Sequence, residues 1–151
     1  MMRPLTRRTL IATTGTLVAA LAFTGCTGAS SAHRDYPIFE QEATAADQPP
    51  QTILDQMSED ASVDAKPEPD SARLAGTYEG VSLWLVKTVA MGNVCLIAAS
   101  ADGEHWVAGC GAPHNGEVMG ADLGTFGWHS DDVEVPSTAT PISENVYVYT
   151  G

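Results

Sequence analysis

The sequence is short of basic residues, and those that it has are unevenly placed. Lys and Arg together number 7 against 19 Asp and Glu, and three of the seven precede Cys26. The residues after Cys26 therefore hold four basic and 19 acidic side chains. Nucleic-acid binding and polybasic adhesion to an anionic bilayer both need clustered Lys and Arg. The charge balance argues against both functions, and we interpret the acidity as support for solubility.

The sequence also lacks an apolar run long enough to cross a bilayer. A spanning helix needs roughly 20 apolar residues, whereas the apolar run over residues 10–23 is interrupted at 13–16 by threonines and a glycine. A short basic segment precedes this run, and small residues lead from it to Cys26. This order is typical of a secretory signal peptide. We therefore expect residues 1–25 to be removed from the mature protein.

Residues 21–26, Leu-Ala-Phe-Thr-Gly-Cys, resemble the lipobox of bacterial lipoproteins. In that family the Cys thiol receives a diacylglycerol and a peptidase cuts just before it. The resemblance implies that Cys26 is the lipidated first residue, although Phe23 stands where the family usually has Leu, Val or Ile. Two acyl chains hold a protein stably on a bilayer. The implied location is the extracytoplasmic face of the cell membrane, and an ordinary secretory signal containing a Cys is the alternative.

Two export routes stay open. Arg7 and Arg8 resemble the adjacent arginines of a twin-arginine signal. Leu10 stands where such signals usually have Phe, and adjacent arginines also occur in the basic segment of general secretory signals.

We expect residues 26–70 to form a lipid-anchored, flexible acidic linker. Residues 27–70 hold ten acids, two basic residues and few aromatics. Such a segment buries too little apolar surface to offset its ordering entropy. A flexible chain of this length has an r.m.s. span of about 35–40 Å and would hold the domain away from the bilayer.

For two short stretches inside the expected linker, an ordered structure is the alternative to disorder. Residues 36–39 are apolar, and we interpret them as scattered hydrophobic residues in a disordered tail rather than as a docking segment. Ile53, Leu54 and Met57 share one helical face, so a short helical turn over 51–57 stays open.

Residues 71–151 are predicted to form a small all-β domain. Strand-like segments lie at 73–78, 81–86, 93–100, 104–110, 117–119, 126–129 and 146–150. Turn signals separate them at 92–93, 102–103, 115–116 and 130–132. Short strands with such punctuation indicate an antiparallel meander, a sandwich or a small barrel.

The two remaining cysteines, Cys95 and Cys110, are predicted to form a disulfide. Thiols oxidise outside the cytoplasm, and Asp102-Gly103 is the preferred pair for a two-residue type I′ hairpin. That hairpin places the two cysteines directly opposite each other, with Cα atoms about 4.5–5.5 Å apart. One face of the hairpin, a predicted core face, then carries Cys95, Ile97, Ala99, Trp106, Ala108 and Cys110. The alternative is metal ligation with His114, which would need a fourth ligand, so we expect neither a metal nor another cofactor.

One group of polar residues contains the residue types of a catalytic or metal site. His114, His129, Ser130, Asp131 and Asp132 lie close in sequence. No G-x-S-x-G elbow accompanies the serine, and the spacing matches no zinc template. We therefore predict no catalytic residue. An enzyme would require a cleft that gathers the two histidines with one of the two aspartates.

Aromatic residues could form a binding face, although core packing is their commoner role in a small β domain. They are Trp84, Trp106, Trp128, Tyr78, Tyr147 and Tyr149.

The whole layout resembles the small, uncharacterised lipobox-type lipoproteins of high-GC Gram-positive bacteria. The resemblance implies a location at the cell membrane and does not indicate any catalysed reaction. Two function classes remain. We favour a non-catalytic extracytoplasmic module that binds a protein, a wall polymer or a small ligand, and the alternative is a small metal-dependent or hydrolytic enzyme.

Overall fold

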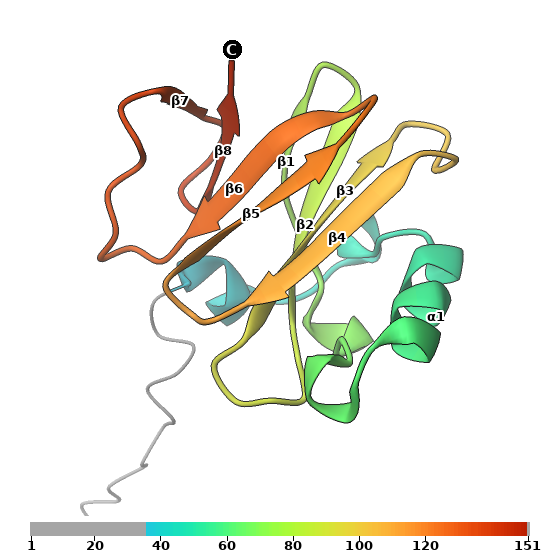
Figure 1. Ribbon diagram of the computed structural model, residues 1–151. Helices are drawn as coiled ribbons and strands as arrows, with labels where there is room; N and C mark the ends of the chain where they lie inside the picture. Colours follow the sequence, from blue (N-terminus) through green and yellow to red (C-terminus); the bar gives the residue numbers. More distant parts are fainter. Residues whose placement is uncertain (1–35, 151) are drawn as a thin grey trace, which may run out of the picture.

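The computed structural model describes residues 36–150, which form a β-sandwich (Figure 1). Two four-stranded antiparallel sheets pack together, in the orders β1-β2-β3-β4 and β5-β6-β8-β7. The all-β prediction is confirmed, in its sandwich form. The expected signal peptide over 1–25, and Cys26 itself, lie outside the described residues.

The strands lie close to their predicted positions. The first sheet contains β1 (Arg73–Tyr78), β2 (Val81–Lys87), β3 (Val94–Ser100) and β4 (Trp106–Gly111), and the second contains β5 (Asn115–Gly120), β6 (Gly124–His129), β7 (Ala139–Pro141) and β8 (Val146–Tyr149). The short edge strand β7 was not predicted. The turn expected at Asn115-Gly116 is wrong, because both residues pair with β6 at the start of β5. Gly116 leaves room there for the Trp128 ring, which a Cβ would overlap.

Alternating side chains fill the space between the two sheets. Leu83, Leu85 and Leu96 from the first sheet meet Phe126, Trp128 and Val146 from the second, and none of the six is more than 2% exposed. Period-two alternation of this kind places one set of side chains from each sheet in a common core.

The opposite face of the first sheet is also buried. Trp84, Val86, Cys95, Ile97 and Ala99 point away from the second sheet and form a separate core cluster. Helix α1 (Gln51–Asp60) covers them with Ile53, Leu54 and Met57, which are 1%, 1% and 8% exposed. Strands β2 and β3 are therefore buried on both faces, which explains their nearly continuous apolar sequence.

Residues 36–70 belong to the folded domain, which corrects the expectation of a flexible linker over 26–70. The segment also contains four short 3-10 turns, η2 (Pro37–Glu40), η3 (Ala45–Asp47), η4 (Val63–Ala65) and η5 (Pro69–Ser71). Tyr36 is fully buried and Phe39 is 8% exposed, so the interpretation of residues 36–39 as a disordered tail is wrong. The helical alternative for residues 51–57 is confirmed by α1.

Polar contacts fasten this segment along the free edge of β1. The Arg73 guanidinium donates to the Gln41 carbonyl at 2.7 Å. The Leu74 amide donates to Asp47 Oδ1 at 3.1 Å. A hydrogen bond from the Thr44 side chain lowers the pKa of Asp47, so this carboxylate stays ionised and keeps accepting. The segment thus covers backbone groups that an edge strand would otherwise expose.

The disulfide between Cys95 and Cys110 is present, and the two residues stand directly opposite each other with Cα atoms 4.0 Å apart. The hairpin turn differs from the expected type I′ form. Its loop has four residues, 101–104, because the Ser100 amide donates to the His105 carbonyl at 2.9 Å. Of the loop residues only Gly103 has a positive φ. The pairing register of β3 and β4 is nevertheless as predicted, because the loop is longer than the expected one by one residue on each side.

The docked helix predicts a stability cost for truncating its buried face. We expect Leu54→Ala to lower the free energy of unfolding by about 2–5 kcal/mol, since it empties space between α1 and the sheet. The exposed neighbour Gln56 is the matched control, and Gln56→Ala should change stability by less than about 0.5 kcal/mol. Urea denaturation followed by tryptophan fluorescence measures both values. Equal midpoints for the two variants would contradict the docking of α1.

Candidate functional site

The structure brings part of the polar group near His114 together, in an order unlike that of a catalytic triad. His114 Nδ1 lies 3.9 Å from Asp132 Oδ2, and both side chains are largely exposed. The buried Ser130 hydroxyl donates to Asp132, and this hydrogen bond lowers the pKa of that carboxyl. The serine therefore donates to the carboxylate, whereas an activated nucleophile donates to an imidazole base.

His129 lies in the interior and does not join that exposed pair. It is 7% exposed, its Nδ1 lies 2.9 Å from the Ser130 carbonyl oxygen, and its buried Nε2 has no hydrogen-bond partner in the described chain. The Asn145 amide donates to the His129 carbonyl at 3.1 Å and to Asp131 Oδ1 at 3.0 Å. These bonds tie the end of β6 to the approach to β8. Among residues 36–150 no group of three or more His, Cys, Asp and Glu is arranged to hold a metal ion.

A different site lies at Trp106, which sequence reasoning placed on the core face of the hairpin. Strand β4 is the edge of the first sheet, and the indole of Trp106 remains partly exposed beside α1. Hollows flank this residue on two sides. We call Trp106 and the linings of both hollows the Trp106 surface.

The apolar hollow lies between the end of α1 and β4, with a volume of about 280 Å³. Its lining consists of Met57, Asp60, Ala61, Ala65, Trp106, Ala108 and Cys110. The disulfide thus forms part of the wall, and Asp60 is the one charged side chain in this lining. The small alanines leave the space open beside the large indole.

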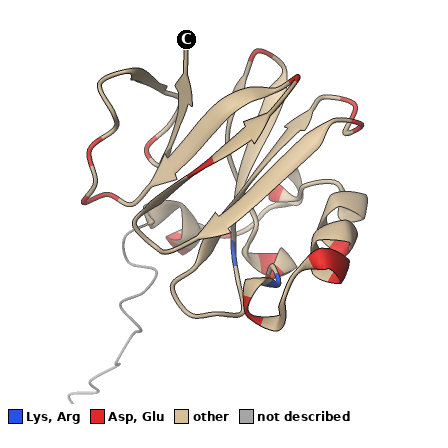
Figure 2. Ribbon diagram, in the orientation of Figure 1, with Lys and Arg blue, Asp and Glu red and all other residues tan. Residues whose placement is uncertain are grey.

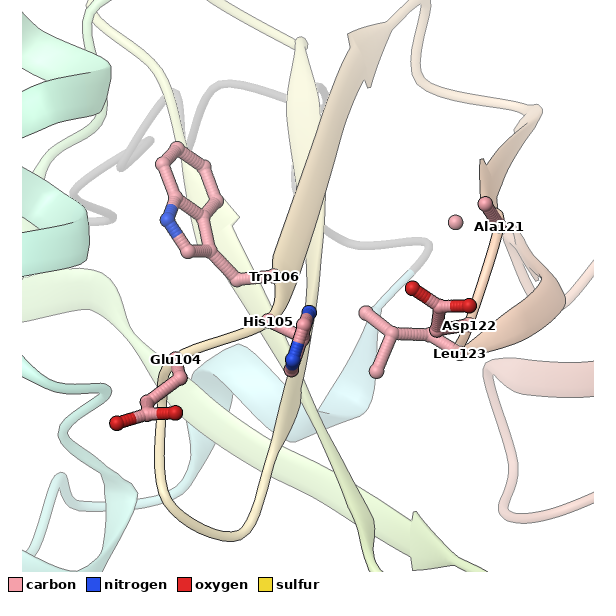
Figure 3. A pocket seen from close by; sticks show the side chains of 7 residues that line it. Glu104, His105, Trp106, Ala121, Asp122 and Leu123 are labelled. Carbon is pink, nitrogen blue, oxygen red and sulfur yellow. The ribbon is translucent and has the colours of Figure 1, made fainter.

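The polar hollow lies at the tip of the hairpin, where it meets the β5–β6 turn, and has a volume of about 220 Å³. Glu104, His105 and Trp106 line one side and residues 120–123 line the other. Figure 3 shows His105 beside Asp122 and Leu123, with Trp106 directed the opposite way, toward the helix. Successive side chains of an extended chain point to opposite faces. Trp106 therefore stands between an apolar and a polar hollow.

The Trp106 surface is acidic. Asp60, Glu104 and Asp122 line it, and neither described lining contains a Lys or Arg side chain. A hydrogen bond from Ser100 lowers the pKa of the adjacent Asp102, which adds a firmly ionised carboxylate at the hairpin tip. The surface therefore favours cationic or neutral groups next to an apolar one.

The other aromatic residues divide between the core and the outer face of the second sheet. Trp84 and Trp128 are buried, and Tyr78 packs edge-on against Phe126 with ring centroids 6.4 Å apart. Tyr147 and Tyr149 lie on the outer face in an edge-to-face pair at 5.5 Å. The Tyr147 ring lies across Gly127, where a Cβ would overlap it. Tyr147 is thus held flat, and only 3% of it is exposed.

Comparison with protein-family models, curated proteins and solved structures found no match for this chain. Between residues 36 and 150, no helix combines the length and the apolar character that crossing a bilayer requires.

The pair formed by Tyr149 and Glu117 predicts an altered titration. The Tyr149 hydroxyl donates to Glu117, and this bond raises the pKa of the phenol because a phenolate would face the carboxylate. We expect Glu117→Gln to lower the pKa of Tyr149 toward its ordinary value of about 10. NMR titration of the tyrosine ring carbons measures it. Glu144→Gln, at another exposed glutamate, is the control, and an unchanged Tyr149 titration in Glu117→Gln would contradict the assignment.

Proposed function

We propose that the mature protein is a lipoprotein, anchored by diacylglycerol on Cys26 at the extracytoplasmic face of the cell membrane, and that it is a non-catalytic binding module. The lipobox-like residues 21–26 and the signal-peptide pattern before them support the anchor. A disulfide-bonded domain of this size is typical of exported proteins.

The observation that carries the binding role is the partly exposed Trp106 between its two hollows. Tryptophan is strongly enriched among residues that dominate protein–protein binding energy. The apolar hollow, at about 280 Å³, is just below the roughly 300–1,000 Å³ of small-molecule sites. It suits one or two side chains of a partner protein better than a larger ligand.

The charge around Trp106 defines the partner further. Asp60 lines the apolar hollow, and Glu104 and Asp122 line the polar hollow on the other side of Trp106, on a domain that is acidic as a whole. Complementary charges across an interface set specificity and speed association. The partner that we propose is an envelope protein with an exposed apolar side chain flanked by Lys or Arg.

The anchor predicts a defined mass. Protein extracted from membranes should lack residues 1–25 and carry an added diacylglyceryl group, measured by intact mass spectrometry. The double variant Thr24→Ala/Cys26→Ser leaves Ala-Phe-Ala, an ordinary cleavage site, and should be exported without lipid and leave the membrane fraction. Thr24→Ala alone is the control and should stay lipidated. A mature wild-type protein without lipid would refute the anchor.

The binding role predicts a loss of affinity when the indole is removed. We expect Trp106→Ala to weaken binding to peptides with an apolar residue between lysines about 30-fold, in line with a strong hot spot. Met119→Ala is the control, because Met119 is 74% exposed and lies outside both hollow linings. Fluorescence polarisation measures both affinities.

Two outcomes would contradict the proposed partner. One is equal binding by wild type and Trp106→Ala, and the other is equal affinity for peptides with glutamates in place of the lysines. Binding to purified wall polymer that Trp106→Ala does not weaken would assign the module to another ligand and another surface.

A further inference from the structure

We propose that the end of the domain formed by Val63, Val89 and Met91 rests on the phospholipid surface to which Cys26 is attached. This orientation depends on the lipid anchor of the proposed function. It adds a second membrane contact, made by the folded domain itself.

Only a short stretch of chain separates the proposed lipid anchor from the folded domain. Nine residues, 27–35, separate Cys26 from Tyr36. Even fully extended, this connection spans no more than about 35 Å, since a residue advances at most about 3.6 Å. Tyr36 is fully buried and its hydroxyl donates to the Pro113 carbonyl. The attachment point is therefore fixed on the domain, and one end of the sandwich is held near the bilayer.

Strand register identifies which end this is. Lys87 at the end of β2 stands opposite Val94 at the start of β3, which stands opposite Gly111 at the end of β4. Pro113 lies two residues beyond Gly111, so Tyr36 lies at the same end as the β2–β3 connection, residues 88–93. Figure 1 shows this connection at one end of the sandwich and the β3–β4 and β5–β6 turns at the other.

The same end presents a group of exposed apolar side chains. Val63 is 72% exposed, Val89 53% and Met91 79%. The connection that carries Val89 and Met91 is held against η4. The Val89 amide donates to the Lys66 carbonyl at 3.0 Å, and the Ala90 amide donates to the Asp64 carbonyl at 3.1 Å. Large apolar side chains gathered on a surface commonly mark a contact, and such side chains enter the interfacial region of a bilayer.

The distribution of charge favours the same orientation. In the described chain the Lys and Arg residues are Lys66, Arg73 and Lys87, and strand pairing and hydrogen bonds put them toward this end. In Figure 2 the blue segments accordingly lie away from the β3–β4 and β5–β6 turns. Residues 88–151 contain no Lys or Arg at all. Acids such as Asp64 and Glu68 accompany the lysines, so charge alone does not bind this end. An anionic bilayer repels the opposite end more strongly, and the apolar side chains make the contact.

Two methionines allow a direct test. Met91 lies at the proposed contact, whereas Met119 lies near the β5–β6 turn at the opposite end, and their exposed fractions are similar, 79% and 74%. Lipidated protein in vesicles of phosphatidylglycerol and phosphatidylcholine is treated with hydrogen peroxide, and peptide mass spectrometry gives both oxidation rates. Thr24→Ala/Cys26→Ser protein in solution is the lipid-free reference.

We expect the Met91-to-Met119 rate ratio to be at least fivefold lower on vesicles than in the lipid-free reference. In lipidated protein, Val89→Asp should remove most of this protection, because it places a charge at the contact. Thr138→Asp, at an exposed position before β7 and away from Met119, is the matched control and should preserve the protection. An unchanged ratio on vesicles, or full protection in Val89→Asp, would overturn the proposal.

Failure of the anchor and failure of the orientation are distinguishable. Intact mass of the vesicle-bound protein is measured first. A mass without diacylglyceryl refutes the anchor, and the orientation with it. A lipidated mass combined with an unchanged oxidation ratio refutes the orientation alone.

Discussion

Burial of the outer face of the first sheet is the constraint on which the rest of this structure depends. Strands β2 and β3 carry apolar side chains on both faces, so the second sheet alone cannot shield them from water. Helix α1 and the segment before β1 supply the missing cover through Ile53, Leu54 and Met57. The same docking creates the apolar hollow beside Trp106. Tyr36 packs in the other core, between the two sheets, and begins the described fold ten residues after Cys26.

Much of the β architecture was predictable because its determinants are local or depend on spacing. Alternation and turn residues located seven of the eight strands, and the spacing of Cys95 and Cys110 gave the register of their hairpin correctly. The turn itself was mispredicted, because Ser100 and Asp102 hydrogen bonds stabilise a longer loop of the same register. The extent of the domain was also mispredicted. Acids and prolines dominate residues 36–70, and the few apolar residues among them gain their energy from a distant sheet.

The candidate site could not be assigned from the sequence, because it depends on the partial exposure of the Trp106 side chain. Trp106 alternates correctly for the face that α1 covers, and no local pattern shows that a hollow beside α1 leaves the indole partly exposed. The pairing of β5 with β6 explains why His114 and His129, two of the candidate site residues, lie in different environments. Asn115 pairs with His129, so His114 lies just outside the strand on the surface while His129 points into the structure.

The uneven distribution of charged and exposed apolar side chains between the two ends of the molecule fits the proposed attachment at one end. Its described lysines and its exposed Val63, Val89 and Met91 lie toward the attachment point, and the acidic hollow beside Trp106 lies at the hairpin tip. In the proposed orientation, a short connection holds the first end at the bilayer and leaves the hairpin tip open to the envelope. The docked segment sets this arrangement, because a free linker of the same sequence would allow every orientation.

Amide hydrogen exchange tests the central claim most directly, since it reports the stability of each segment separately. If α1 is part of the cooperative fold, the amides of Met57 and its neighbours in the last turns of the helix exchange nearly as slowly as those of β3. Exchange of these α1 amides at the rate of an unstructured peptide, with β3 still protected, would contradict the account.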